Sequence, residues 1–272
     1  MKSPIKWMGG KSRSVKKIVP NIPVHKTYVE PFFGAGWVFF GKEPSNMEII
    51  NDVNSQLINF FEVLKCNSEE LIERINLTFR SRELFLKYRD SLDCENLSPL
   101  EKAFRFYYIN QNAFGGLIRY NSKGKCNSPF AGSPDSFSLS SYWDYEKLKK
   151  AHERLKDVVV ENDTYQKIIK RYDREYTFFY LDPPYESKGR YNGDNFFDYD
   201  ELKQLCLDIK GKFILTLNSE LYGKFSVFNV YENNVPYTIN CNKKENKSSK
   251  KELIISNFDF NISKTDESHE IV

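Results

Sequence analysis

Cysteine and histidine are scarce in this chain, which argues against two kinds of stabilising chemistry. The 272 residues include five cysteines, and no two of them have C-x-x-C spacing. An odd number without that spacing favours neither a disulfide framework nor a zinc site. The sequence holds only three histidines, so we expect no catalytic metal in the protein.

Long hydrophobic runs are also missing. No stretch approaches the ~20 apolar residues that a membrane-spanning helix needs. The N-terminus lacks the apolar core of a signal peptide. We therefore expect a cytoplasmic protein without a membrane partner.

Neither sign of charge dominates. The formal net charge is +3, which by itself is a weak argument for a nucleic-acid partner. Basic residues nevertheless gather near the N-terminus, around residues 119–125 and in a polar stretch at 243–251. Each group is either a solvated surface or part of a phosphate-binding one.

Short apolar runs rich in β-branched and aromatic residues are abundant. Separated by helical patterns, such runs predict the buried strands of an α/β fold, with a mostly parallel sheet and helices on both faces. No helical segment separates the last two runs, which predicts an antiparallel hairpin at the sheet edge. The seven predicted strands are 27–32, 48–50, 157–160, 177–181, 212–217, 227–231 and 252–255.

The strand–helix alternation stops between residues 61 and 151, where the pattern is helical. Ser98, Pro99 and Glu101 form a helix-start signal, and Asn67 followed by Glu70 forms a weaker one. We expect residues 1–60 and 152–272 to form one α/β domain, with 61–151 inserted into it as a helical subdomain.

A glycine-rich turn, Phe32-Phe33-Gly34-Ala35-Gly36, directly follows the first predicted strand. Glycines at a strand-to-helix turn let a ligand approach the backbone closely. Asp52 ends the next strand, where nucleotide-binding α/β folds place an acid that binds the ribose hydroxyls. The pair points to an adenosine-containing cofactor. The alternative is a packing turn with an unrelated surface aspartate.

The sequence Asp182-Pro183-Pro184-Tyr185 follows the strand predicted at 177–181. The carboxyl ends of strands carry the active sites of open α/β sheets. Two prolines fix the backbone and remove two N–H donors, so the Pro183 carbonyl and the Asp182 carboxylate become paired acceptors for an exocyclic amine. Tyr185 offers a flat face for a base taken out of the duplex. The alternative is a rigid turn with a capping aspartate.

Trp7 and Lys11 flank a Gly-Gly pair near the N-terminus. A tryptophan and a lysine beside such a turn are suited to closing over the charged end of a ligand. The alternative is that this segment caps the fold.

These three elements, in this order, resemble the Dam family of DNA adenine methyltransferases, in the group whose recognition region lies between the glycine motif and D-P-P-Y. K-W-M-G-G-K, Y-V-E-P-F-F-G-A-G, N-D-V-N-S, L-D-P-P-Y and K-E-L-I-I-S-N carry the resemblance over nearly the whole chain. It implies a Rossmann-like methyltransferase fold and S-adenosylmethionine as cofactor. The implied reaction is site-specific methylation of N6 on a flipped-out adenine in double-stranded DNA. The family also admits a pairing with a restriction endonuclease.

The resemblance assigns roles to individual residues. Those implied for the cofactor are Trp7, Lys11, Phe32, Gly34, Gly36, Asp52, Asp163 and Asp182. Those implied for catalysis are Asp182, Pro183, Pro184 and Tyr185. Those implied for DNA are Asn110, Phe114, Leu117, Arg119, Asn121, Lys123, Lys125 and Pro129, in a hairpin near 110–130.

Within this hairpin, Leu117, Arg119 and Pro129 match the family positions that read base edges, and Phe114 matches an aromatic wedge. Gln111 and Gly115 depart from the usual arginine and asparagine, so the target sequence stays open. Arg119 is alternatively a phosphate clamp without sequence preference. Three other functions also remain: a cytosine N4 methyltransferase, an inactive DNA-binding relative and an RNA methyltransferase.

Overall fold

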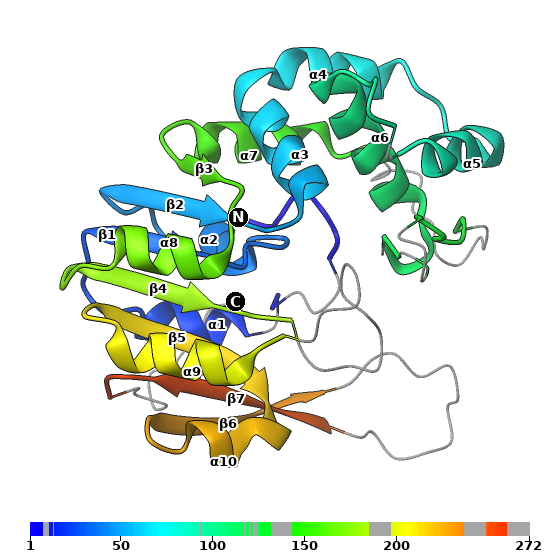
Figure 1. Ribbon diagram of the computed structural model, residues 1–272. Coiled ribbons are helices and arrows are strands. Elements are labelled where there is room, and N and C mark those ends of the chain that lie inside the picture. The colour runs from blue at the N-terminus through cyan, green and yellow to red at the C-terminus, as the bar shows by residue number, and fades with distance from the viewer. Residues whose placement is uncertain are drawn as a thin grey trace, which may run out of the picture.

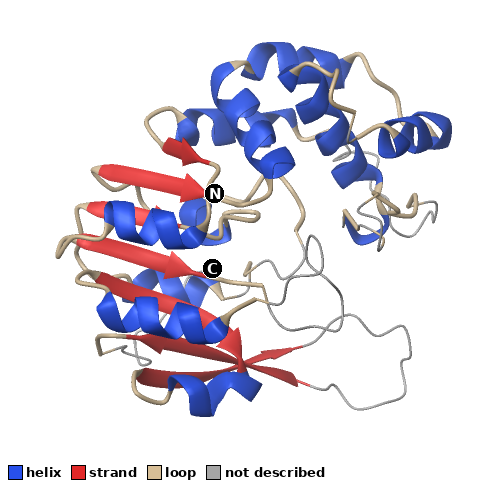
Figure 2. Cartoon of the chain, viewed as in Figure 1, coloured by secondary structure: helices blue, strands red, loops and turns tan. Residues whose placement is uncertain are grey.

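The predicted strands assemble into one seven-stranded sheet with the order β3-β2-β1-β4-β5-β7-β6 (Figures 1 and 2). The computed structural model describes residues 1–7, 11–12, 14–92, 94–116, 118–119, 121, 125–131, 143–184, 197–236 and 249–259. The strands are β1 (Thr27–Glu30), β2 (Met47–Asn51), β3 (Val159–Glu161), β4 (Thr177–Leu181), β5 (Lys212–Asn218), β6 (Asn229–Pro236) and β7 (Ser249–Ser256).

Strands β1 to β5 pair in parallel, while β7 lies between β5 and β6 and runs antiparallel to both. The predicted mostly parallel sheet with an antiparallel edge hairpin is therefore confirmed. β1 stops at Glu30, two residues earlier than expected, because Pro31 has no N–H to continue the ladder. β6 continues to Pro236, past the predicted end at 231, because its polar residues still pair with β7.

Alternate residues of the strands point to two separate hydrophobic layers. Val29, Phe179 and Leu215 face α8 (Tyr165–Tyr172) and α9 (Tyr199–Asp208) on one side of the sheet. The other side faces α1 (Val15–Ile18) and α2 (Trp37–Gly41), as Figure 1 shows. A short helix, α10 (Tyr222–Phe225), follows β5. Helices thus cover both faces, as the parallel connections require.

The α-helices described in the helical region are α3 (Ser55–Cys66), α4 (Ser68–Asn76), α5 (Arg82–Asp90), α6 (Pro99–Asn112) and α7 (Tyr145–Leu155). Ser98 caps α6 through a bond to Glu101 N–H, as expected. Asn67 precedes α4, but its side chain makes no capping bond. Phe61 of α3 packs edge-on against Phe33 at 4.9 Å, so the helices share one core with the sheet.

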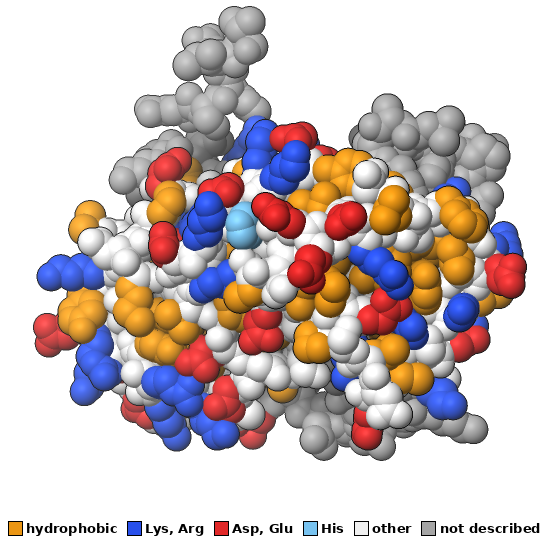
Figure 3. Space-filling model, turned by 90° about the horizontal axis from the view of Figure 1, so that it is seen from above, with side chains coloured by type: hydrophobic (Ala, Val, Ile, Leu, Met, Phe, Trp, Pro, Cys, Tyr) orange, Lys and Arg blue, Asp and Glu red, His pale blue; other side chains and the backbone are white. Residues whose placement is uncertain are grey.

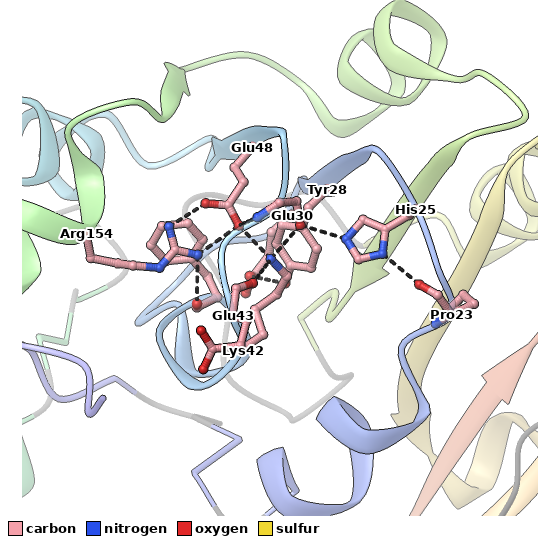
Figure 4. Close-up of polar contacts among 10 residues, drawn as sticks. Pro23, His25, Tyr28, Glu30, Lys42, Glu43, Glu48 and Arg154 are labelled. Carbon is pink, nitrogen blue, oxygen red and sulfur yellow. Dashed lines mark hydrogen bonds and ion pairs between the residues drawn. The ribbon is translucent and has the colours of Figure 1, made fainter.

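A buried ionic cluster fastens the last of these helices to the sheet (Figure 4). Glu48, at the start of β2, is bonded by Arg154 of α7 at 2.8 Å and by Lys42 Nζ at 2.5 Å. The Arg154 guanidinium also lies 3.9 Å from the centre of the Phe39 ring. Burial alone would raise the pKa of Glu48, but the two cations outweigh it and the pKa is lowered.

The face seen in Figure 3 carries acidic and basic side chains interspersed with hydrophobic ones. Among the described residues on this face, charges of the two signs are mixed, and no continuous positively charged area of the kind typical of a DNA-binding surface is seen. No helix in the described part of the chain is both long and apolar enough to cross a bilayer. The described residues also contain no cluster of three or more side chains that could hold a metal ion.

Candidate active site

The turn after β1 has the close backbone packing that its glycines allow. Gly34 and Gly36 adopt φ values of 48° and 63°, in the left-handed region that L side chains rarely enter. A Cβ on Gly34 would lie 2.8 Å from Trp7 Cδ1. The structure therefore brings Trp7 and the glycine turn together. Trp7 also contacts Phe106 of α6, with 6.3 Å between ring centres.

Asp52 lies directly beneath this turn. Its Oδ2 accepts a bond from Gly34 N–H and its Oδ1 one from Asn54 N–H, each 2.9 Å long. The side chain is almost fully buried, and this burial raises the pKa of Asp52 to about 6. Asp52 thus joins the end of β2 to the glycine turn after β1.

Asn51, for which we predicted no role, braces the neighbouring strand ends. Its buried amide donates to Pro31 O at 2.9 Å and to Asp163 O at 3.0 Å, and it accepts from Asp163 N–H at 2.8 Å. Asp163 is consequently fixed at the same sheet edge as Asp52. Lys167 and the Thr164 N–H stabilise its carboxylate and lower the pKa of Asp163.

An aromatic cluster, also not predicted as such, borders this edge. Phe32 of the glycine turn lies 5.0 Å from Tyr165 and 5.7 Å from Phe197, and Tyr165 lies 5.3 Å from Phe197. All three rings are only partly buried. Together they form a partly exposed apolar surface at the edge of the sheet where β1 and β3 end.

Asp182 directly follows β4 and is bonded from two directions. Lys11 Nζ lies 2.7 Å from its Oδ1, and Thr216 Oγ1 of β5 donates to the same oxygen at 2.8 Å. Burial raises the pKa of Asp182 although Lys11 and Thr216 act in the opposite direction. Nearby, the Tyr199 hydroxyl donates to Pro184 O at 2.6 Å. Asp182 and Pro184 are thus both held by hydrogen bonds, and the buried Pro183 lies between them in the sequence.

The described residues that were predicted to contact DNA, apart from Asn110, lie in a hairpin that follows α6. Ala113 and Phe130 form an antiparallel bridge, and Phe114 N–H bonds to Pro129 O at 2.8 Å. Arg119 is held through its backbone, with its N–H bonded to Ser128 Oγ at 2.7 Å. The exposed residues among those predicted to contact DNA are Phe114, Arg119, Asn121, Lys125 and Pro129.

Asn110 differs from these residues because its side chain is fully buried. Its amide donates to Lys6 O at 2.6 Å and Gly116 O at 3.1 Å, and it accepts from Lys6 N–H at 3.0 Å. In this arrangement it fastens the N-terminal segment to the hairpin. Three further predicted residues, Leu117, Lys123 and Tyr185, lie outside the described residues.

Lys6, Trp7 and Lys11 therefore reach three parts of the candidate site. Lys6 contacts the hairpin, Trp7 the glycine turn and Lys11 the carboxylate of Asp182. The predicted residues Gly36, Asp52, Asp163 and Asp182 follow the carboxyl ends of β1, β2, β3 and β4. In an open α/β sheet this edge is where ligands bind.

Comparison with known proteins gives a consistent result. The model of the D12 class of N6 adenine-specific DNA methyltransferases matches residues 7–238. The type II methyltransferase M.MjaIII of Methanocaldococcus jannaschii is 28% identical, covering 93% of this chain and 98% of that protein. M1.LlaDCHI of Lactococcus lactis is 29% identical, covering 93% and 94%.

The DNA adenine methylase of Escherichia coli K12 is 29% identical over 66% of this chain and 64% of its own length. Because the family model spans most of the sequence, the Rossmann-like sheet described above is a methyltransferase sheet. The chain belongs to the D12 class of N6 adenine-specific DNA methyltransferases.

Proposed function

We propose that this DNA adenine N6-methyltransferase takes its methyl group from S-adenosylmethionine and delivers it at Asp182, Pro183, Pro184 and Tyr185. The observation that carries the proposal is the anchoring of Asp182. Thr216 and Lys11 both bond its Oδ1, while no described donor bonds its Oδ2. The carboxylate is therefore fixed in orientation, with one acceptor available to an incoming amine.

The residues at the sheet edge suit an adenosine-containing cofactor. Asp52 is the proposed acceptor for the ribose hydroxyls. The partly buried rings of Phe32, Tyr165 and Phe197 form an apolar surface against which a purine can stack. Asp163 is an acceptor for the purine's amine. Gly34, Gly36 and Trp7, which lie together in the fold, complete the proposed cofactor set, to which the resemblance alone also assigns Lys11 and Asp182.

The proposed chemistry depends on two acceptors that face the target nitrogen. Adenine N6 is a weak nucleophile because its lone pair is delocalised into the ring. Bound S-adenosylmethionine supplies an electrophilic methyl group on a sulfonium. Asp182 Oδ2 and Pro183 O accept both N–H bonds as N6 becomes tetrahedral, which returns electron density to the nitrogen. Positioning and electrostatic stabilisation thus provide most of the acceleration, and after transfer the methylated nitrogen loses one proton to solvent.

Stacking and pairing bury N6 in duplex DNA, so we propose that the target adenine is flipped out of the helix. Phe114 is 53% exposed at the hairpin, as a wedge into the vacated stack requires. Arg119 and Pro129, with Leu117, are the proposed base readers. Asn121, Lys123 and Lys125 are the proposed backbone contacts, and the predicted contribution of Asn110 is to hold the hairpin in place.

Two further expectations extend this proposal. Two relatives are named type II methyltransferases, so we propose a pairing with a restriction endonuclease whose site this enzyme protects. We also propose that the enzyme acts in the cytoplasm. The test is whether DNA from expressing cells resists an endonuclease that cleaves the same sequence in unmodified DNA.

Purified protein, double-stranded DNA and methyl-labelled S-adenosylmethionine test the proposal directly. After digestion to nucleosides we expect the label in N6-methyladenine, and long-read sequencing then gives the target sequence. Label in N4-methylcytosine, or transfer to RNA alone, would overturn the proposal. Absence of labelled-cofactor binding would favour an inactive relative.

A further inference from the structure

We infer that Lys11 is a positioning residue for methyl transfer: held from behind by Glu252, it fixes Oδ1 of Asp182 and reserves Oδ2 for the target amine. This role differs from the cofactor contact predicted for Lys11 by resemblance. The inference rests on the proposed catalytic role of Asp182.

The contacts of the lysine support this division of the carboxylate. The Lys11 side chain is 6% exposed and lies 2.7 Å from Asp182 Oδ1, whereas the Asp182 side chain keeps 20% of its surface open. Thr216 donates to the same Oδ1 from the adjacent strand β5. Two donors on one oxygen restrict rotation of the carboxyl group, and Oδ2 is the oxygen to which no described donor is bonded.

Glu252, on β7, holds the lysine in turn. Its Oε1 lies 3.3 Å from Lys11 Nζ, and its Oε2 accepts bonds from Ser14 Oγ at 2.9 Å and Asn233 Nδ2 at 3.4 Å. Lys17 donates to Asn233 Oδ1 at 2.8 Å. Both oxygens of Glu252 are thus engaged, and the antiparallel edge hairpin contributes a fixed charge to the active site.

The other end of the D-P-P segment is anchored in the same manner. Tyr199 donates to Pro184 O at 2.6 Å, while no described donor bonds Pro183 O. The oxygens with partners are therefore Asp182 Oδ1 and Pro184 O. Asp182 Oδ2 and Pro183 O are the two acceptors that the proposed chemistry needs.

Charge balance around Asp182 makes the inference testable. The described groups that interact with it are Lys11 from the N-terminal segment, Thr216 from β5 and Glu252 from β7, and Asp182 in turn raises the pKa of Glu30 on β1 and of Tyr180 on β4. Lys11 is the cation of this group, and the carboxylates of Asp182 and Glu252 outweigh burial to raise the pKa of Lys11. Removing it leaves Asp182 among other acidic groups, which favours the protonated form.

The test compares Lys11→Gln, Lys11→Arg and Thr216→Val in single-turnover methylation between pH 6 and 9. An opposite charge this close shifts a carboxyl pKa by about one to three units. We therefore expect the acid limb of the Lys11→Gln profile to move to higher pH by that amount. Thr216→Val should move it less, in the same direction, and Lys11→Arg should restore part of the wild-type profile.

A second variant separates the function of Lys11 from simple loss of folding. Lys11→Gln leaves Glu252 and Asp182 facing each other without a cation, so Lys11→Gln/Glu252→Gln should unfold at a higher temperature than Lys11→Gln. Its acid limb should return part of the way toward wild type, because Glu252 raises the pKa of Asp182. An independent structural role for Glu252 would instead make the double variant less stable than either single one.

Cofactor affinity decides between the two roles of Lys11. We expect calorimetry to give an S-adenosylmethionine Kd for Lys11→Gln within about threefold of wild type. A tenfold or greater loss of affinity with an unchanged pH profile would overturn the inference and make Lys11 a cofactor ligand. Asp182→Asn distinguishes this failure from a wider one, because turnover in that variant would reject the proposed role of Asp182 itself.

Discussion

Asp52 Oδ2 accepts a 2.9 Å hydrogen bond from the backbone N–H of Gly34, so the residue proposed to bind ribose also fixes the turn that is proposed to contact the cofactor. Asp52→Ala removes both functions. Bonds to a charged group contribute about 1.5–3 kcal/mol each. We expect S-adenosylmethionine affinity to fall by at least about tenfold in calorimetry. Unchanged affinity would leave Asp52 with a structural role alone.

The pH dependence of cofactor binding offers a second test of the same carboxylate. Burial raises the pKa of Asp52 to about 6, and the ionised form is the better acceptor for two hydroxyls. Affinity should therefore be full above pH 6 and decline as the pH falls through that value. Asp52→Asn should bind more weakly and show a flatter profile. The free energy of unfolding depends on pH in the opposite direction. Because the pKa of Asp52 is higher in the folded protein, protonation favours the folded state, and this contribution to stability is lost as the pH rises from about 4 to 6.

Asp182→Ala should abolish methyl transfer and leave cofactor affinity nearly intact, because we propose that Asp182 contacts the target amine. Loss of a preorganised electrostatic contact costs at least ~10²-fold in rate. Turnover and cofactor Kd are to be measured on one preparation. Asp157→Ala is the matched control, since Asp157 is exposed and precedes β3, whereas the candidate site lies at the carboxyl ends of the strands. Turnover of Asp182→Ala within a few-fold of that control contradicts the assignment.

Arg154→Met tests whether the buried cluster of Figure 4 holds the helical region to the sheet. It leaves Glu48 buried with Lys42 as its remaining cation. Removing one partner of a buried pair costs about 3–5 kcal/mol. Urea unfolding should show a loss of this order. The pKa of Glu48 is lowered in the folded protein. This contribution to stability is therefore present at pH values above the pKa that Glu48 has in the unfolded chain, and it is lost as the pH falls through the folded pKa. A variant as stable as wild type at pH 7 would contradict this role.

The sheet could be predicted because each strand is a local pattern in the sequence. The hairpin at its edge could be predicted because no helix separates the last two strands. The end of β6 could not be predicted, because Glu232 and Asn233 lack an alternation of apolar residues and pair with β7 only in the folded sheet. Ser98 and Asn67 show the same limit at helix starts. Both precede a helix as expected, but only Ser98 completes its cap.

The candidate site was predictable as a set of motifs and not as a set of contacts. Resemblance related Lys11 to the cofactor, whereas the fold places its Nζ on Asp182. Thr216 and Glu252 went unassigned because no spacing connects β5 and β7 with the N-terminal segment. Asn110 was expected at the DNA, yet its amide points inward to Lys6 and Gly116. Motif order does not give the direction of a side chain.

Recognition is tested by comparing Arg119→Ala with Lys125→Ala, two exposed basic residues of one hairpin. The Arg119 backbone is fixed on both sides, by Ser128 Oγ and by Asn127 N–H, so its guanidinium projects from a defined point. A bidentate contact to guanine is worth about 1–3 kcal/mol of discrimination. Arg119→Ala should therefore relax specificity at one position of the target.

Lys125→Ala should instead weaken binding to all sequences about equally and reduce the salt dependence, because a phosphate contact is sequence-blind. The measurement is methylation of a substrate panel in which each base pair of the target is varied in turn, repeated at two salt concentrations. If Arg119→Ala lowers the rate on every substrate by one common factor, Arg119 is a backbone clamp. Base reading then falls to the other exposed positions of the hairpin, and Pro129, which is held beside Phe114 by the bridge at its base, is the next residue to substitute.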